Sequence, residues 1–244
     1  MKKNNHSIRW ADRNLAKDWY TIKSEAQFKA LPKEQQDYWN KQPTISYKLN
    51  SHGFRSDEFS EEECRESITF LGCSNTYGSH LHKENTWSYL VAKELNLKEI
   101  NLGIPAGSLD SAFRVYNEWQ PIHKSKITCL FIPPGSRMET TGEGCWDNIG
   151  QWNLARTDTS AETRLFIADL LSDINQEVRT DRNIAAIKYI AQETQSKLIV
   201  MNYNEALLSL LVDTARDGFH PGPKSNRFLA DKFIQMIGNI EFIK

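Results

Sequence analysis

The sequence predicts an α/β fold in which helices cover both faces of a central parallel sheet. Segments with the apolar, β-prone character of buried strands end in small polar residues, as residues 68–71 do at Gly72. Amphipathic helical segments alternate with these strands, and such an alternation produces parallel sheets with right-handed crossovers. The chain has 244 residues, of which 39% are hydrophobic, enough for one substantial core. We therefore expect a three-layer α/β/α sandwich over residues 51–244, preceded by an N-terminal arm over residues 1–50.

The arm is polar but rich in aromatic side chains, which argues against disorder. Its aromatic residues include Trp10, Trp19, Tyr20, Phe28, Tyr38 and Trp39. Two short helices are expected at residues 24–31 and 33–39, because Pro32 interrupts the helical pattern. Such an arm packs on the domain or on another subunit, so a homo-oligomer or an assembly partner held through the arm stays open. His52 and Arg55, just beyond it, are expected to have solvated or structural roles.

The spacing of apolar residues predicts the order of elements in the domain. Strands are expected at residues 68–71, 98–102, 127–132 and 197–202, and helices at residues 86–95, 108–119, 160–195 and 225–240. Ser108 is a suitable cap for its helix, and the long helical segment has a polar stretch near residues 175–183 where two helices meet. Residues 207–212 fit either a fifth short strand or a helical turn.

Residues 133–160 are predicted to form a long connection without regular structure, and connections of that length are usually functional or mobile. Folded over the carboxyl ends of the strands, this connection would line a substrate cleft. Trp146 and Trp152 would then either stack on a sugar or an acyl group or serve as packing anchors.

Two short segments carry residues suited to nucleophilic catalysis. Ser74 follows the strand at 68–71, and open α/β sheets place their sites at the carboxyl ends of strands. Asp217 and His220 share one turn-forming loop. A nucleophilic serine needs a base, and the base needs a carboxylate that orients it. Taken alone, Asp217 fits a turn residue and His220 a helix-entry residue, but together with Ser74 they predict a catalytic triad.

These segments resemble the sequence blocks of the SGNH (GDSL-type) hydrolases. Residues 72–78, G-C-S-N-T-Y-G, are similar to the block that holds the nucleophile, and residues 217–222 are similar to the last block, with its Asp and His. Residues 101–107, N-L-G-I-P-A-G, resemble the second block, whose Gly amide contributes to the oxyanion hole, and either Ala106 or Gly107 occupies that place here. The resemblance covers about residues 50–240 and implies a flavodoxin-like sandwich and ester hydrolysis.

The chain departs from the family in two places. Cys73 stands where the family has an Asp outside the triad, and alternation along the strand predicts that Cys73 packs beneath the sheet. In the third block no Asn follows the strand at 127–132, although the family completes its oxyanion hole with that side chain. Either the hole is incomplete, which typically costs about a hundredfold to a thousandfold in rate, or another side chain donates. The substitute donors are Ser136, Arg137, Asn148 and Asn153.

The composition excludes several other classes of function. The 30 basic and 31 acidic residues nearly cancel and form no long basic run, so no nucleic-acid partner is expected. No apolar run resembles a secretory signal or a membrane span, so we expect no membrane association and a cytoplasmic location. The four cysteines lack metal-type spacing and are expected to be reduced thiols. We therefore expect no metal and no organic cofactor.

Together, the residues and the resemblance predict a serine esterase that acts on a small-molecule or carbohydrate ester, with acetyl as one candidate acyl group. Ser74 attacks the carbonyl, His220 takes its proton, and Asp217 orients His220. The amides of Ser74 and of Gly107 or Ala106, with Arg137, would hold the oxyanion. Two alternatives stay open: a binding or structural module with this fold and weak or lost catalysis, and an O-acyltransferase that uses the same residues.

Overall fold

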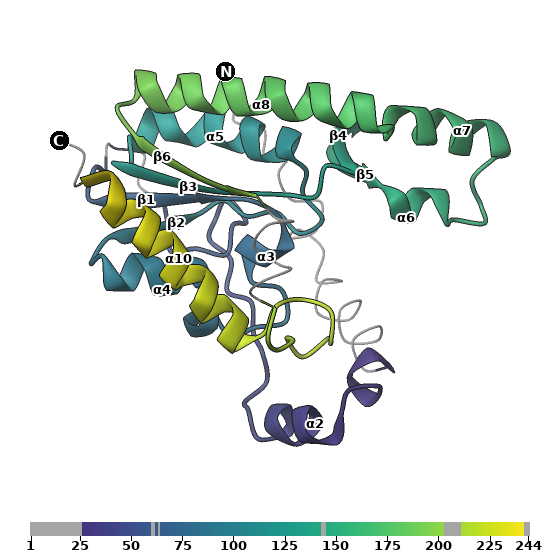
Figure 1. The fold of residues 1–244 in the computed structure, drawn as a ribbon, viewed down its shortest axis with the longest axis horizontal. Coiled ribbons are helices and arrows are strands. Elements are labelled where there is room, and N and C mark those ends of the chain that lie inside the picture. The colour runs from purple at the N-terminus through teal and green to yellow at the C-terminus, as the bar shows by residue number, and fades with distance from the viewer. Residues whose placement is uncertain (1–25, 60–61, 63, 143–144, 203–210, 242–244) are drawn as a thin grey trace.

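The computed structural model describes residues 26–59, 62, 64–142, 145–202 and 211–241, and the statements below refer to these. A four-stranded parallel sheet with the strand order β2-β1-β3-β6 forms the centre (Figure 1). Its strands are β1 (Ser67–Leu71), β2 (Lys98–Asn101), β3 (Ile127–Ile132) and β6 (Lys197–Asn202). All four predicted strands are confirmed. Most of the segment at 207–212 lies outside the described residues.

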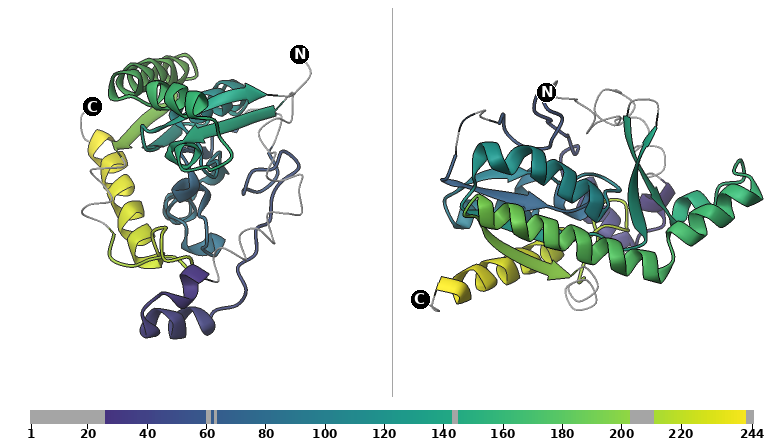
Figure 2. Two further views of the ribbon diagram at one scale, coloured as in Figure 1. Left: turned by 90° about the vertical axis from the view of Figure 1, so that its right-hand side faces the viewer. Right: turned by 90° about the horizontal axis from the view of Figure 1, so that it is seen from above.

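Helices cover both faces of the sheet (Figures 1 and 2). One face packs on α5 (Leu109–His123) and α8 (Asp173–Glu193), and the other on α4 (Trp87–Glu94) and α10 (Pro223–Glu241). Neighbouring residues of β1 serve opposite faces, since Leu71 belongs to the first core and Phe70 to the second. The predicted three-layer α/β/α sandwich is therefore confirmed.

The helices begin where the sequence offers caps. Ser108 forms a capping box with Ser111 at the start of α5. The long helical segment divides into α7 (Ala161–Leu170) and α8, so the predicted break near residues 175–183 was placed too late. Ser172 has an extended backbone before α8, and Asp173 follows in the first turn, where a carboxylate is favourable.

A β-hairpin occupies much of the connection that was predicted to lack regular structure, so that prediction was wrong. Strand β4 (Arg137–Gly142) pairs antiparallel with β5 (Cys145–Gly150), and the short helix α6 (Gln151–Leu154) follows. The hairpin is tied to α5 by Arg114, which donates two hydrogen bonds to the Glu139 carboxylate at 2.7 and 2.8 Å. This bidentate ion pair holds the hairpin against the main domain.

The described part of the arm packs on the domain. Residues 26–29 are helical and α2 (Lys33–Asn40) follows, as expected from Pro32. Phe28 and Trp39 are buried together with Leu81 and Ala215, which lie in two loops of the domain. Trp10, Trp19 and Tyr20 lie outside the described residues, and the domain boundary at residue 50 stays a prediction. Within the described ranges, no helix has both the length and the apolar character needed to cross a membrane.

Candidate active site

Ser74 lies at the carboxyl end of β1, as predicted. It begins the short helix α3 (Ser74–Tyr77) and is 8% exposed. Gly72 makes this tight exit from the strand feasible, because a Cβ there would lie 2.2 Å from Thr76 Oγ1 and 2.8 Å from the Phe131 carbonyl oxygen. Cys73 is buried, as expected, and its Sγ lies 4.0 Å from Ser74 Oγ.

Asp217 and His220 form a tight pair on the loop before α10. His220 Nδ1 lies 2.6 Å from Asp217 Oδ2, and Asp217 Oδ1 accepts the backbone N–H groups of Phe219 and His220, each at 3.1 Å. Burial tends to raise the pKa of Asp217, but the hydrogen bond and the charge of His220, with a smaller effect of His80, lower it to about 2. The carboxylate is therefore ionised at neutral pH, and Nδ1 of His220 is the nitrogen that carries a proton toward it.

A second histidine, which the sequence analysis did not select, approaches the same carboxylate. His80 Nε2 lies 3.6 Å from Asp217 Oδ2, and the His80 and His220 rings are 5.8 Å apart. Burial lowers the pKa of His80 to about 4, although the charge of Asp217 opposes this shift. His80 is therefore neutral at pH 7. The sequence feature that could have identified His80 as a site residue is its position six residues after Ser74.

The loops of Ser74 and of His220 lie side by side. The carbonyl of His80 accepts a hydrogen bond from the Arg216 N–H at 3.4 Å. The hydrogen bond of the Ser74 hydroxyl goes to Cys73 Sγ at 4.0 Å, and among the described residues none joins Ser74 to His220. Catalytic hydrogen bonds are often long before substrate binds, so this geometry of the free protein is compatible with a triad.

Arg55 and Tyr47 form hydrogen bonds to the backbone of the turn that follows Ser74 and includes His80. The Arg55 guanidinium donates to the carbonyls of Gly78 at 2.5 Å and Leu81 at 2.7 Å. The Tyr47 hydroxyl accepts the backbone N–H of His80 at 2.7 Å. Arg55 is only 2% exposed, so its role is structural, as expected. His52 also packs structurally, 4.5 Å from the ring of Trp119.

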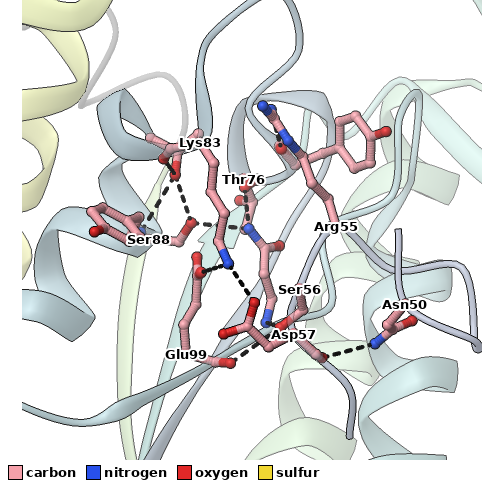
Figure 3. Close-up of polar contacts among 12 residues, drawn as sticks. Asn50, Arg55, Ser56, Asp57, Thr76, Lys83, Ser88 and Glu99 are labelled. Carbon is pink, nitrogen blue, oxygen red and sulfur yellow. Dashed lines mark hydrogen bonds and ion pairs between the residues drawn. The ribbon is translucent and has the colours of Figure 1, made fainter. Parts of the chain in front are cut away.

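Asn101 joins the Ser74 turn to the loop after β2. Its amide donates to the Thr76 carbonyl at 2.8 Å and to Ser88 Oγ at 2.9 Å, and its oxygen accepts the Gly103 N–H at 2.9 Å. Figure 3 shows Thr76 and Ser88, the two residues to which the Asn101 amide donates. Nearby, the buried Glu99 carboxylate lies 3.6 Å from Lys83 Nζ. Burial raises the pKa of Glu99. Asn101 therefore links the turn after Ser74 to the loop after β2 by hydrogen bonds.

The two candidate backbone donors in the second block differ in what they contact. The Gly107 N–H donates to the Ile104 carbonyl at 2.8 Å, which closes a turn. Ala106 has a left-handed backbone with φ of 59°, and its N–H makes no hydrogen bond within the described part of the chain. Arg137 Nη1 lies 3.4 Å from the Gly107 carbonyl, so the hairpin brings this guanidinium to the same loop.

The other predicted side chains have structural contacts. Trp146 is covered by the Arg114 guanidinium at 4.6 Å, whereas Trp152 is 41% exposed and faces Arg137 at 5.5 Å. The side-chain oxygens of Asn148 and Asn153 accept hydrogen bonds from Ser111 and from the Gly150 N–H. These bonds use both Asn oxygens to fix the hairpin and the start of α6.

His80, Asp217 and His220 also have the chemistry of metal ligands, with ligand atoms within 4.8 Å of one another. Around a tetrahedral zinc, however, neighbouring ligand atoms are about 3.3 Å apart, as follows from Zn–N distances near 2.0–2.1 Å. The 2.6 Å between His220 Nδ1 and Asp217 Oδ2 is the length of a charge-assisted hydrogen bond. The observed arrangement is that of a proton-sharing pair.

Comparison with solved structures finds similarity to esterases. The chain is 13% identical to the psychrotrophic esterase EstA from Pseudoalteromonas sp., with a TM-score of 0.38 over 71% of this chain and 97% of that chain. It is 17% identical to a catalytic mutant of Axe2, an acetylxylan esterase from Geobacillus stearothermophilus, with a TM-score of 0.37 over 73% and 97%. A putative lipolytic protein of the G-D-S-L family from Desulfitobacterium hafniense is 12% identical, with a TM-score of 0.36 over 70% and 99%.

No protein-family model and no curated protein matches the chain. At these identities and TM-scores the structural likenesses do not establish a family.

Proposed function

We propose that the protein is a serine esterase with Ser74 as nucleophile, His220 as base and Asp217 as its orienting carboxylate. The observation that carries this proposal is the Asp217–His220 pair, in which an ionised, backbone-held carboxylate lies 2.6 Å from His220 Nδ1. This contact fixes one tautomer and leaves His220 Nε2 to accept a proton. Such a base is required to activate a serine hydroxyl.

The proposed reaction has two stages. Ser74 Oγ attacks the acyl carbonyl while its proton passes to His220 Nε2, and the imidazolium then gives that proton to the leaving alcohol. Water repeats the sequence on the acyl-enzyme and releases the acid. Asp217 stays ionised throughout and stabilises the imidazolium, which its low pKa of about 2 favours.

We assign the oxyanion to the N–H groups of Ser74 and Ala106. Gly107 is the weaker candidate because its N–H already bonds the Ile104 carbonyl at 2.8 Å. Arg137 contacts this loop, with Nη1 3.4 Å from the carbonyl of Gly107, and is our candidate to substitute for the third-block Asn. Trp152, partly exposed and facing Arg137, would then line the substrate entrance.

The test is covalent labelling with a fluorophosphonate at neutral pH, followed by intact-mass measurement. The wild type should gain one adduct, and Ser74→Ala should gain none. Ser79→Ala is a matched control in the same loop and should label like the wild type. If the folded wild type is not labelled, the esterase proposal fails, and a binding module with this fold becomes the better description. If it is labelled, a panel of acetyl and longer-chain esters, with and without an added alcohol, separates hydrolysis from acyl transfer.

A further inference from the structure

The outer face of α8 carries a stripe of exposed apolar side chains. Ile174, Val178 and Tyr189 are 76%, 59% and 62% exposed, and Ala185 is exposed between them. The buried face of α8, with Ile187 and Ile190, packs on the domain core. Figure 1 shows α8 along one edge of the molecule, with α7 continuing past the sheet. Large apolar side chains gathered on one exposed helix face usually mark an interaction surface.

The stripe is narrow and has charges at its centre. At 3.6 residues per turn, positions 174, 178, 181, 182, 185 and 189 fall within about 100° of one another around the helix axis. Asp181 and Arg182 are both exposed, and they form the middle of the series. The order along the helix is therefore apolar, acidic, basic, apolar.

Because of this order, the stripe of one α8 helix is complementary to the same stripe of a second, antiparallel α8 helix. In an antiparallel pair centred between residues 181 and 182, Ile174 faces Tyr189 and Val178 faces Ala185 of the second copy. Asp181 then faces Arg182, twice, by symmetry. At the borders, Glu177 faces Ala186 and Asn175 faces Lys188, so no like charges meet. A relative slip of seven residues, or two turns, in either direction would instead place Arg182 opposite Ile174 or opposite Lys188.

We propose that the partner of this surface is a second copy of the same chain, which forms a two-fold dimer through antiparallel α8 helices. An interface of this isologous kind uses one patch twice, as the pattern requires. Helix α8 has 21 residues and is about 31 Å long, and helices of that length pack well along a shared seam. Arg182 is available for the pair because its present partner, Asp110 Oδ1 at 3.3 Å, is bound more closely by Asn183 at 2.7 Å.

Sedimentation of the full chain over a range of concentrations tests the association. A dimer of twice the 28.1 kDa chain mass is expected. Asp181→Arg and Arg182→Asp should each raise the dimer dissociation constant by about tenfold or more, because both symmetric pairs become repulsive. The double exchange should restore the dimer, because it restores both attractive pairs. Phe228→Glu is the control, since it alters an exposed aromatic residue of α10 away from the stripe.

Disulfide trapping tests the orientation. Chains with Ile174→Cys mixed with chains with Tyr189→Cys should cross-link to each other on mild oxidation. Neither variant should cross-link to itself, because the two copies of residue 174 would lie about 22 Å apart along the helix. The wild type under the same oxidation measures any background from its native cysteines. A monomer at every concentration overturns the proposal, as do self-cross-linking of Ile174→Cys and failure of the double exchange to restore the dimer.

Discussion

His80 and His220 approach the same oxygen of Asp217, at 3.6 Å and 2.6 Å respectively. Only the shorter contact is a hydrogen bond, since 3.6 Å exceeds the normal range. The two imidazoles are therefore not equivalent. His220 is oriented by the carboxylate, whereas His80 is held by its own backbone, between Tyr47 and Arg216.

The first prediction separates the two histidines by activity. With the proposed mechanism, His220→Ala should lower kcat for a chromogenic acetyl ester by about a thousandfold, the usual scale for loss of a general base. His80→Asn should keep kcat within about tenfold, because Asp217 and His220 stay paired. Steady-state kinetics on both variants, with circular dichroism to check folding, provides the measurement. The reverse order of the two losses would identify His80 as the base.

The second prediction concerns stability in acid. The unfolded chain protonates His80 near its ordinary pKa of 6.5, whereas in the folded protein this pKa is about 4. Protons therefore bind preferentially to the unfolded state as the pH falls below 6.5, and stability is lost down to about pH 4. This difference corresponds to about 2 kcal/mol between pH 7 and pH 4.5. Asp217 acts in the same direction, but only below its unfolded pKa of 3.8.

Urea unfolding of the wild type and of His80→Asn at pH 7 and pH 4.5 measures this effect. The variant should lose less free energy of unfolding on acidification than the wild type. Tyr47→Phe is the matched control, because it removes the hydroxyl that accepts the His80 N–H but keeps the imidazole. An equal acid response of wild type and His80→Asn would show that His80 is not the group that is buried neutral.

Much of the fold and the main candidate residues could be predicted from local patterns. The four strands are short apolar runs that end in polar residues, and Ser74, Asp217 and His220 stand in turns whose residue types are distinctive. The hairpin at 137–150 escaped prediction because its strands mix Arg, Glu and Asp with few apolar residues. Its stability depends on pairing and on the Arg114–Glu139 ion pair, which links segments 25 residues apart.

Other features depended on contacts between distant parts of the chain. His80 lies 3.6 Å from Asp217 in a loop whose backbone is bound by Arg55 and Tyr47. The choice between Ala106 and Gly107 depends on a turn bond to Ile104, which residue types alone do not reveal. Patterns within one segment therefore located the candidate catalytic residues, whereas their supports required the folded structure.

The third prediction tests the support by Arg55. Arg55→Lys should lower the free energy of unfolding by about 2 kcal/mol, because a lysine cannot reproduce the forked contacts to the Gly78 and Leu81 carbonyls and leaves a buried acceptor unpaired. Urea midpoints give the measurement. Arg156→Lys is the control, since that guanidinium is exposed and pairs with an equally exposed carboxylate, Asp158, so its replacement should leave the midpoint unchanged. Equal midpoints for both variants would contradict the structural role of Arg55.

The fourth prediction uses two glycines with opposite surroundings. A Cβ on Gly103 would lie 2.5 Å from the Tyr77 backbone nitrogen and 2.9 Å from the Thr76 carbonyl carbon, so Gly103→Ala must push on the turn that carries Ser74. We expect a loss of about 1–3 kcal/mol of stability from this overpacking, with a fall in esterase activity of more than about tenfold from the displaced turn. A Cβ on Gly238, inside α10, would meet nothing within 4 Å, so Gly238→Ala should instead stabilise the protein by about 0.5–1 kcal/mol and leave activity unchanged. Thermal unfolding and ester hydrolysis of the two variants measure both effects. If Gly103→Ala keeps wild-type activity, close packing of the second block against the Ser74 turn is not what holds the nucleophile in place.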